Sequence, residues 1–183
     1  MRYVIIGTSG CGKSTLARAL AKAQQAPHVE LDALHWAADW TPRRKSEFIE
    51  GVRAATQAER WVADGNYGVV RDVLWSRATH IVWLNFGRGV VIARVIGRTL
   101  RRSLLGEPLW SGNRETLRRA FFSRESIVLW SLTTFHKNRR KYAELRGDAA
   151  YAHLHWIELR TPREARRFLE SMSHPPAAAG QAT

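Results

Sequence analysis

The stretch Gly7-Thr8-Ser9-Gly10-Cys11-Gly12-Lys13-Ser14 fits the phosphate-binding loop (P-loop) pattern G-x-x-x-x-G-K-[ST] at every fixed position. The glycines of such a loop allow a tight turn in which successive backbone N–H groups converge on a phosphate, and the following helix adds the positive end of its dipole. The lysine reaches the β- and γ-phosphates, and the serine hydroxyl binds Mg²⁺. We therefore expect ATP and Mg²⁺ as cofactors, with Lys13 catalytic, Ser14 on the metal, and nucleotide contacts from Gly7, Ser9, Gly10, Cys11, Gly12, Lys13, Ser14 and Thr15.

The segments around this loop alternate between strand-like and helix-like patterns. An apolar run at Tyr3–Ile6 predicts a buried strand before the loop, and Lys13–Lys22 predicts a helix after it. Such alternation indicates an α/β fold, in which a parallel sheet is covered by helices on both faces and ligands bind at the carboxyl ends of the strands. The further predicted strands are His28–Leu31, Trp61–Ala63, His80–Leu84 and His155–Leu159, and the further predicted helices are Thr41–Gln57 (with Thr41 as N-cap and Pro42 in the first helical position), Val69–Trp75, Gly89–Leu105, Arg114–Leu145 and one that opens with a capping box at Thr161-Pro162-Arg163-Glu164.

The composition sets broad limits on the class of protein. The chain of 183 residues suits a single domain, which we expect over residues 1–172, with residues 173–183 disordered because they are rich in proline, alanine and glycine. No apolar run approaches the ~18 residues that span a bilayer, and the pattern of a secretory signal is missing. Cys11 is the one cysteine, so a reducing cytoplasm fits best. Its side chain is either a small filler of the loop or a redox-sensitive thiolate.

Acidic residues follow two of the predicted strands. Asp64 closes the third strand, where phosphoryl transfer needs a carboxylate near the metal, so we expect it to be a Mg²⁺ ligand that acts through water or through another ligand of the metal. Asp32 closes the second strand and is expected to accept the proton of an acceptor hydroxyl. The alternatives are turn chemistry for Asp64-Gly65-Asn66 and helix capping for Asp32. The residues expected to contact the acceptor are Asp32, Trp36, Asn66, Tyr67 and Arg71.

Positive charge is concentrated between residues 88 and 146, within a chain whose net charge is +13. Such an excess suits a nucleic acid or a site that handles several phosphates. Arg94 and Arg98 are four residues apart on one helical face, with Arg101 and Arg102 one turn further on. We expect Arg94 and Arg98 to be catalytic and Arg98 and Arg102 to contact the nucleotide. The alternative is a solvated helix face.

Taken together, these features resemble the adenylate-kinase-related P-loop kinases, and most closely the branch often labelled DNA topology modulation protein. The resemblance rests on the P-loop, the strand end at Asp32, the run Trp61-Val62-Ala63-Asp64-Gly65-Asn66-Tyr67, Gly112-Asn113-Arg114-Glu115, the run from Trp130 to Tyr142, and the arginine-rich helix after the fourth strand. It implies a P-loop NTPase fold of the nucleoside- and nucleotide-kinase type, with a five-stranded parallel sheet in the order 2-3-1-4-5. It also implies an inserted helical lid over about residues 100–141.

The chain departs from adenylate kinase at the acceptor side. Where that enzyme has Asp-Gly-Phe-Pro-Arg, this chain has Asp64-Gly65-Asn66-Tyr67-Gly68, and its arginine is delayed to Arg71. Residues 85–88, Asn-Phe-Gly-Arg, replace the usual acidic residue and proline after the fourth strand. The sequence therefore predicts a kinase that transfers the γ-phosphate of MgATP to a small molecule, nucleoside or nucleotide, with the acceptor and the oligomeric state left open.

Two competing functions remain. The first is a nucleic-acid-associated ATP-binding regulator, which the charge favours, although the sequence offers no convincing helix-turn-helix and no cysteines for a zinc site. The second is a GTPase, which would need an Asn-Lys-x-Asp run to read guanine, and the run Lys137-Asn138-Arg139-Arg140 does not supply it. A small-molecule kinase is the favoured prediction.

Overall fold

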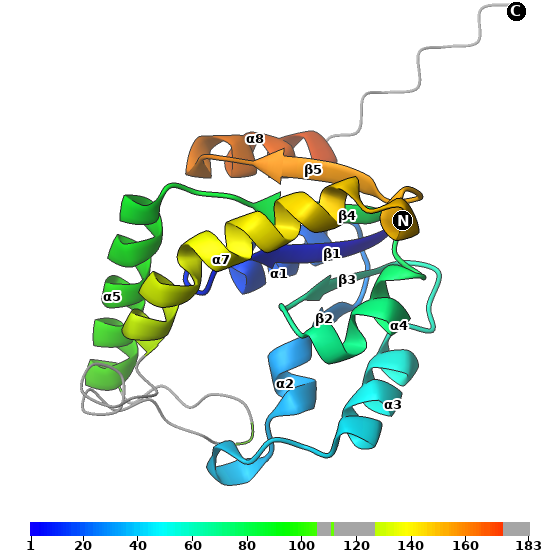
Figure 1. Ribbon diagram of the computed structural model, residues 1–183, viewed down its shortest axis with the longest axis horizontal. Helices are drawn as coiled ribbons and strands as arrows, with labels where there is room; N and C mark the ends of the chain where they lie inside the picture. The colour runs from blue at the N-terminus through cyan, green and yellow to red at the C-terminus, as the bar shows by residue number, and fades with distance from the viewer. Residues whose placement is uncertain (106–110, 112–126, 174–183) are drawn as a thin grey trace, which may run out of the picture.

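The computed structural model describes residues 1–105, 111 and 127–173. Within them lies one five-stranded sheet in the order β2-β3-β1-β4-β5, and every pair of neighbouring strands is parallel (Figure 1). This order confirms the fold predicted from the sequence. The strands are β1 (Arg2–Gly7), β2 (His28–Glu30), β3 (Trp61–Asp64), β4 (His80–Leu84) and β5 (His155–Leu159). The helices are α1 (Lys13–Ala23), α2 (Leu31–His35), η1 (Ala38–Trp40), α3 (Lys45–Ala55), η2 (Gly68–Val70), α4 (Arg71–Trp75), α5 (Arg88–Leu105), α7 (Ile127–Gly147), η4 (Ala149–Tyr151) and α8 (Pro162–Ser173).

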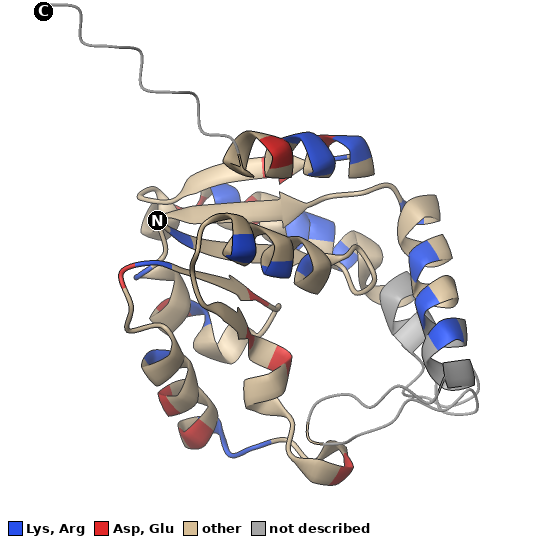
Figure 2. Ribbon diagram, turned by 180° about the vertical axis from the view of Figure 1, so that it is seen from behind, with Lys and Arg blue, Asp and Glu red and all other residues tan. Residues whose placement is uncertain are grey.

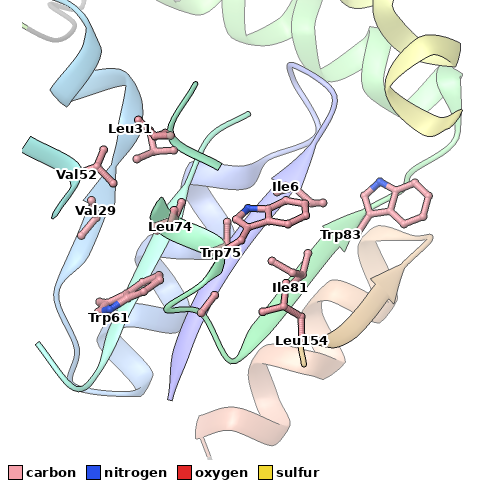
Figure 3. Close-up of a cluster of buried hydrophobic side chains, with 14 of the residues drawn as sticks. Ile6, Val29, Leu31, Val52, Trp61, Leu74, Trp75, Ile81, Trp83 and Leu154 are labelled. Atoms are coloured by element: carbon pink, nitrogen blue, oxygen red, sulfur yellow. The ribbon is translucent and has the colours of Figure 1, made fainter. Parts of the chain in front are cut away.

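Side chains alternate across the central strand and divide the core into two layers. Val4 and Ile6 of β1 face the first layer, together with apolar residues of α3 and α4 and Tyr142 of α7 (Figure 3). Tyr3 and Ile5 face the second layer, which contains the apolar face of α1 and partly buried side chains of α8. This period of two is what strands buried on both faces require. The sheet is therefore covered on both faces, as the alternation of elements predicts.

The segment after β2 differs from the sequence prediction. Leu31 was expected to end the second strand, but β2 ends at Glu30 and Leu31 begins α2, so Asp32 lies in the first turn of a short helix. The expected N-cap at Thr41 is also wrong, because α3 begins at Lys45, and it ends at Ala55 rather than Gln57. Pro42 instead forms an isolated antiparallel bridge with Trp36. That bridge keeps the segment extended where local propensity favours a helix.

The carboxyl-terminal elements agree well with the prediction. Thr161 accepts a hydrogen bond from the N–H of Glu164 at 3.2 Å, and the Glu164 carboxylate accepts one from the N–H of Arg160 at 2.7 Å. The predicted capping pattern therefore does begin α8, although the glutamate reaches the residue before the cap. Ser173, expected in the tail, is the last residue of α8, and residues 174–183 lie outside the described part.

The predicted helix over Arg114–Leu145 and the lid over residues 100–141 fall partly outside the described residues. The described part of that helix is α7, in which Phe135 is buried in the second core layer. The bounds of the lid thus stay a prediction.

Among the helices of residues 1–105 and 127–173, none combines the length and the apolar character that a membrane crossing requires.

Candidate active site

The P-loop connects β1 to α1 and closes the carboxyl end of the central strand. Gly12 is the N-cap of α1 in the left-handed region, with φ 97°, and it offers no capping side chain to the first turn. The N–H groups of that turn are therefore available to an anion, which the helix dipole also favours. Gly10, with φ 83°, lies against α5, since a Cβ there would come within 2.0 Å of a Val95 methyl. The loop is thus held between two helices.

Cys11 is fully buried in this loop. Burial raises the pKa of its thiol, although the positive charges of Lys13 and Arg94 act in the opposite direction. A neutral thiol in this position supports the reading of Cys11 as a filler of the loop. Lys13 and Ser14 are half-buried and Thr15 is exposed.

Ser14 and Asp64, the two expected metal ligands, meet directly. The Ser14 hydroxyl donates a hydrogen bond of 2.6 Å to Oδ2 of Asp64, whose side chain is 4% exposed. The contact follows from the strand order, because β3 pairs with β1 in a register that places Asp64 beside Ile5, just before the loop. A hydroxyl and a carboxylate at this spacing are hard oxygen ligands of the kind Mg²⁺ takes alongside nucleotide phosphates. These two residues fit Mg²⁺, and no group of three or more His, Cys, Asp or Glu elsewhere in the described chain could hold a metal.

His28 contacts the second carboxylate oxygen of Asp64, and the sequence analysis did not predict this role. Its Nε2 lies 2.9 Å from Oδ1 of Asp64, so both carboxylate oxygens have a partner. Nδ1 of His28 lies 3.7 Å from Glu30, which pairs with Arg18 at 3.0 Å. A row of polar side chains therefore runs from the surface to Ser14. The signal available from sequence was weak, since it required knowing that β2 lies beside β3.

Asp32 and Tyr67 meet on the acceptor side. The Tyr67 hydroxyl donates a hydrogen bond of 2.5 Å to Oδ1 of Asp32, and the indole of Trp36 hydrogen-bonds to the Tyr67 hydroxyl. Burial and then the Asp32 charge raise the pKa of Tyr67, so the phenol keeps its proton. His35 stacks at 4.6 Å from the Tyr67 ring, and burial lowers its pKa against the opposing effect of Asp32. The structure thus brings together three of the five expected acceptor residues.

The side chain of Asn66 is hydrogen-bonded to the P-loop. Its Nδ2 donates to the Gly7 carbonyl at 2.6 Å, and its Oδ1 accepts from the Gly7 N–H at 3.4 Å. The side chain of Asn66 therefore fixes the turn after β3 to the end of β1. Its expected role as an acceptor ligand stays a prediction.

A hollow lies beside Tyr67 at the carboxyl edge of the sheet. Asn66, Tyr67 and Arg71 line it from the turn after β3 and the start of α4, and Tyr142 lines it from α7; its remaining lining residues are Ile6, Leu31, Gly65, Leu74 and Trp75. The guanidinium of Arg71 stacks over the Trp75 ring at 5.5 Å. Arg71 and Tyr67, two of the residues expected to contact the acceptor, therefore line the same hollow.

The α5 arginines reach the loop from the other side. Nη1 of Arg94 donates a hydrogen bond of 2.7 Å to the Cys11 carbonyl, and its guanidinium lies over the Phe86 ring at 5.1 Å. Arg98 is half-buried one turn further along α5, and Arg101 is exposed. Arg102 belongs to α5, but its side chain lies outside the described residues. Within the described part of the chain, Arg94 is thus in contact with the P-loop backbone.

Comparison with known proteins agrees with this geometry. The family described as ATPase family associated with various cellular activities (AAA) matches residues 3–70, the segment that contains the P-loop and Asp64. No curated protein sequence matches the chain significantly.

Two solved structures share the fold over nearly the whole chain. One is a gluconokinase from Sinorhizobium meliloti 1021, with a TM-score of 0.52 and 18% identity over 94% of this chain and 93% of that chain. The other is a sugar kinase from Janibacter sp. HTCC2649, with a TM-score of 0.52 and 19% identity over 98% of both chains. At these identities the likeness shows the fold alone.

The contact between His28 and Asp64 generates a prediction. Replacing His28 by Ala leaves Oδ1 of Asp64 without its partner, so the carboxylate can rotate away from Ser14. We expect the Mg²⁺ concentration needed for half-maximal binding of a fluorescent ATP analogue to rise about 10- to 100-fold, as is typical when a partner of a metal ligand is lost.

A titration of analogue binding with Mg²⁺ tests this effect, with His28→Gln as the matched variant. A glutamine amide can still donate to Asp64 and should restore most of the affinity. Equal Mg²⁺ dependence in wild type and His28→Ala would show that His28 does not orient Asp64.

Proposed function

We propose that the chain is an ATP-dependent kinase that transfers the γ-phosphate of MgATP to a small acceptor. The observation that carries this proposal is the arrangement at one sheet edge, where the P-loop with its Ser14–Asp64 contact stands next to the Asp32–Tyr67 contact. Hydrolysis alone needs no second polar site for an acceptor. A kinase needs both sites at the same edge.

Each polar group then has a role in the transfer. Lys13 and the N–H groups of the P-loop bind the phosphates, and Ser14 and Asp64 would hold Mg²⁺, which would supply positive charge to the phosphates. The acceptor oxygen forms a bond to the γ-phosphorus while the bond to the bridging oxygen breaks, and Asp32 accepts the acceptor proton. Tyr67 orients Asp32 by donating to its other oxygen. Arg94 can exchange the Cys11 carbonyl for a phosphate.

The comparisons support the general reaction and suggest the kind of acceptor. Both structural neighbours are described as kinases of sugars or sugar acids, which favours a small polyhydroxylated acceptor. The AAA match over residues 3–70 favours ATP as the nucleotide. Membership of the adenylate-kinase-related branch labelled DNA topology modulation protein, and a cytoplasmic location, are finer assignments that rest on the sequence alone.

Lys13→Ala tests the kinase proposal itself. The substitution removes a charge that binds phosphate and no packing contact that the fold needs. We expect ATP-dependent phosphoryl transfer, measured over a panel of sugars, sugar acids and nucleosides, to fall by about 10²-fold or more with an unchanged circular dichroism spectrum. Transfer at the wild-type rate in a folded variant would rule out the P-loop as catalytic.

Asp32→Asn tests the proton acceptor. An amide keeps the size of the carboxylate and its contact with Tyr67, but it cannot take the acceptor proton. We expect kcat to fall by about 10²- to 10⁴-fold while the affinity for an ATP analogue is retained. Asp39→Asn, at an exposed position of η1, is the matched control. An equal loss of ATP affinity would place Asp32 at the nucleotide or metal instead.

Arg94→Ala separates the kinase from a nucleic-acid-binding regulator. If Arg94 serves the transferring phosphate, we expect transfer to fall by about 10³-fold while the salt dependence of any DNA affinity stays the same. If it contacts a DNA backbone, the slope of log affinity against log salt should become shallower by about one, with transfer unchanged. Arg88→Ala, an exposed arginine at the start of α5, controls for net charge.

A further inference from the structure

Positive charge reaches the hollow beside Tyr67 from two elements that are far apart in the sequence. Arg71, at the start of α4, lines the hollow, as does Tyr142 of α7. The residue before Tyr142 is Lys141, which feels the charges of Arg71 and of Lys137 one turn earlier on α7. Arg71 and Lys141 are half-buried, and Lys137 is exposed. In Figure 2 the charged residues on the described parts of α5 and α7 are mostly Lys and Arg, while Asp and Glu are seen on other elements such as α3.

Within the described part of the chain, these cations have no direct acidic partner. The ion pairs observed there with Asp or Glu involve Arg18, His28, Arg146 and Arg160, and none involves Arg71, Lys137 or Lys141. The adjacent Asp72 accepts a hydrogen bond of 3.1 Å from the Tyr151 hydroxyl, which also hydrogen-bonds to Arg71. The Tyr151 hydroxyl therefore stands between Arg71 and this carboxylate.

Holding these cations together without an anion is unfavourable. Burial, followed by the charges of Arg71 and Lys137, lowers the pKa of Lys141. A negatively charged group in the hollow would relieve both effects, because it would restore the lost solvation and separate the like charges. Arginine is also the side chain whose planar donors best match a carboxylate or a phosphate.

We propose that Arg71 and Lys141 bind a negatively charged group of the acceptor, so that the substrate of this site is an anionic small molecule. The inference rests on the proposed kinase function for the identity of the ligand as acceptor. Tyr67 lines the same hollow and contacts Asp32, so an anion held by Arg71 leaves the remainder of the acceptor directed towards Asp32. The charged group is a carboxylate or a phosphate, and the experiment distinguishes the two.

Calorimetry on the full chain tests this inference, with and without Mg²⁺ and a nonhydrolysable ATP analogue. The probes are glucuronate and glucose, which share the pyranose ring and differ by a carboxylate in place of the hydroxymethyl group, together with glucose 6-phosphate and inorganic phosphate. We expect at least one anionic probe to bind about tenfold or more tightly than glucose, since hydrogen bonds to a charged group are stronger than those to a neutral one. Tighter binding of glucuronate identifies a carboxylate site, and tighter binding of the phosphate compounds identifies a phosphate site.

Variants then assign the binding to the two residues. Arg71→Met and Lys141→Met keep the length of the side chains, and each should weaken the anionic probe by about tenfold while the affinity for the ATP analogue stays within about twofold. Arg140→Met, exposed on the same helix, is the matched control and should leave both affinities unchanged.

Three outcomes would overturn the inference: glucose binding as tightly as the anions, anion binding that survives both substitutions, or an equal loss of ATP-analogue affinity, which would assign the cations to the nucleotide. Failure of the kinase proposal gives a different result. In that case the wild-type chain would transfer no phosphate from MgATP to any probe, while the titrations still decide whether Arg71 and Lys141 bind an anion.

Discussion

The hydrogen bond between Ser14 and Asp64 is the contact on which the arrangement of the site depends. It joins the start of α1 to the end of β3, and it can form only because β3 lies directly beside β1. Trp61 and Ala63 are fully buried in one core layer, which fixes the face of β3 that Asp64 presents to the loop. The order of the strands therefore decides which carboxylate meets the serine of the P-loop.

The fold was predictable because its signals are local. β1, β3 and β4 are short, mainly apolar runs that end at or just before a glycine or a polar residue, and α8 has its own cap, formed by Thr161 and Glu164. The prediction failed where a tertiary contact overrode local propensity. Thr41-Pro42 has the composition of a helix start, but the bridge between Pro42 and Trp36 and the hydrogen bond from Arg43 N–H to the His35 carbonyl keep that segment extended.

The candidate site was less predictable than the fold, because only part of its signals are local. The P-loop is a contiguous motif, and Asp32 and Asp64 could be placed by their positions at strand ends. His28 and Lys141 could not be placed in the site from the sequence. Their contacts depend on neighbours that only the sheet order and the path of α7 bring close. Residues that act through partners on other elements leave little trace in a single sequence.

The two halves of the site are mechanically connected through Asn66. Because its amide binds both the N–H and the carbonyl of Gly7, the turn that carries Tyr67 cannot shift without disturbing the P-loop. Asp32 is attached to the same unit through Tyr67. The expected metal ligands and the proposed proton acceptor are thus held in one frame built on β1 and β3. The proposed transfer requires an acceptor oxygen and a γ-phosphate aligned within about 0.5 Å, so a frame that connects both halves of the site to adjacent strands would supply much of the required positioning before either substrate binds.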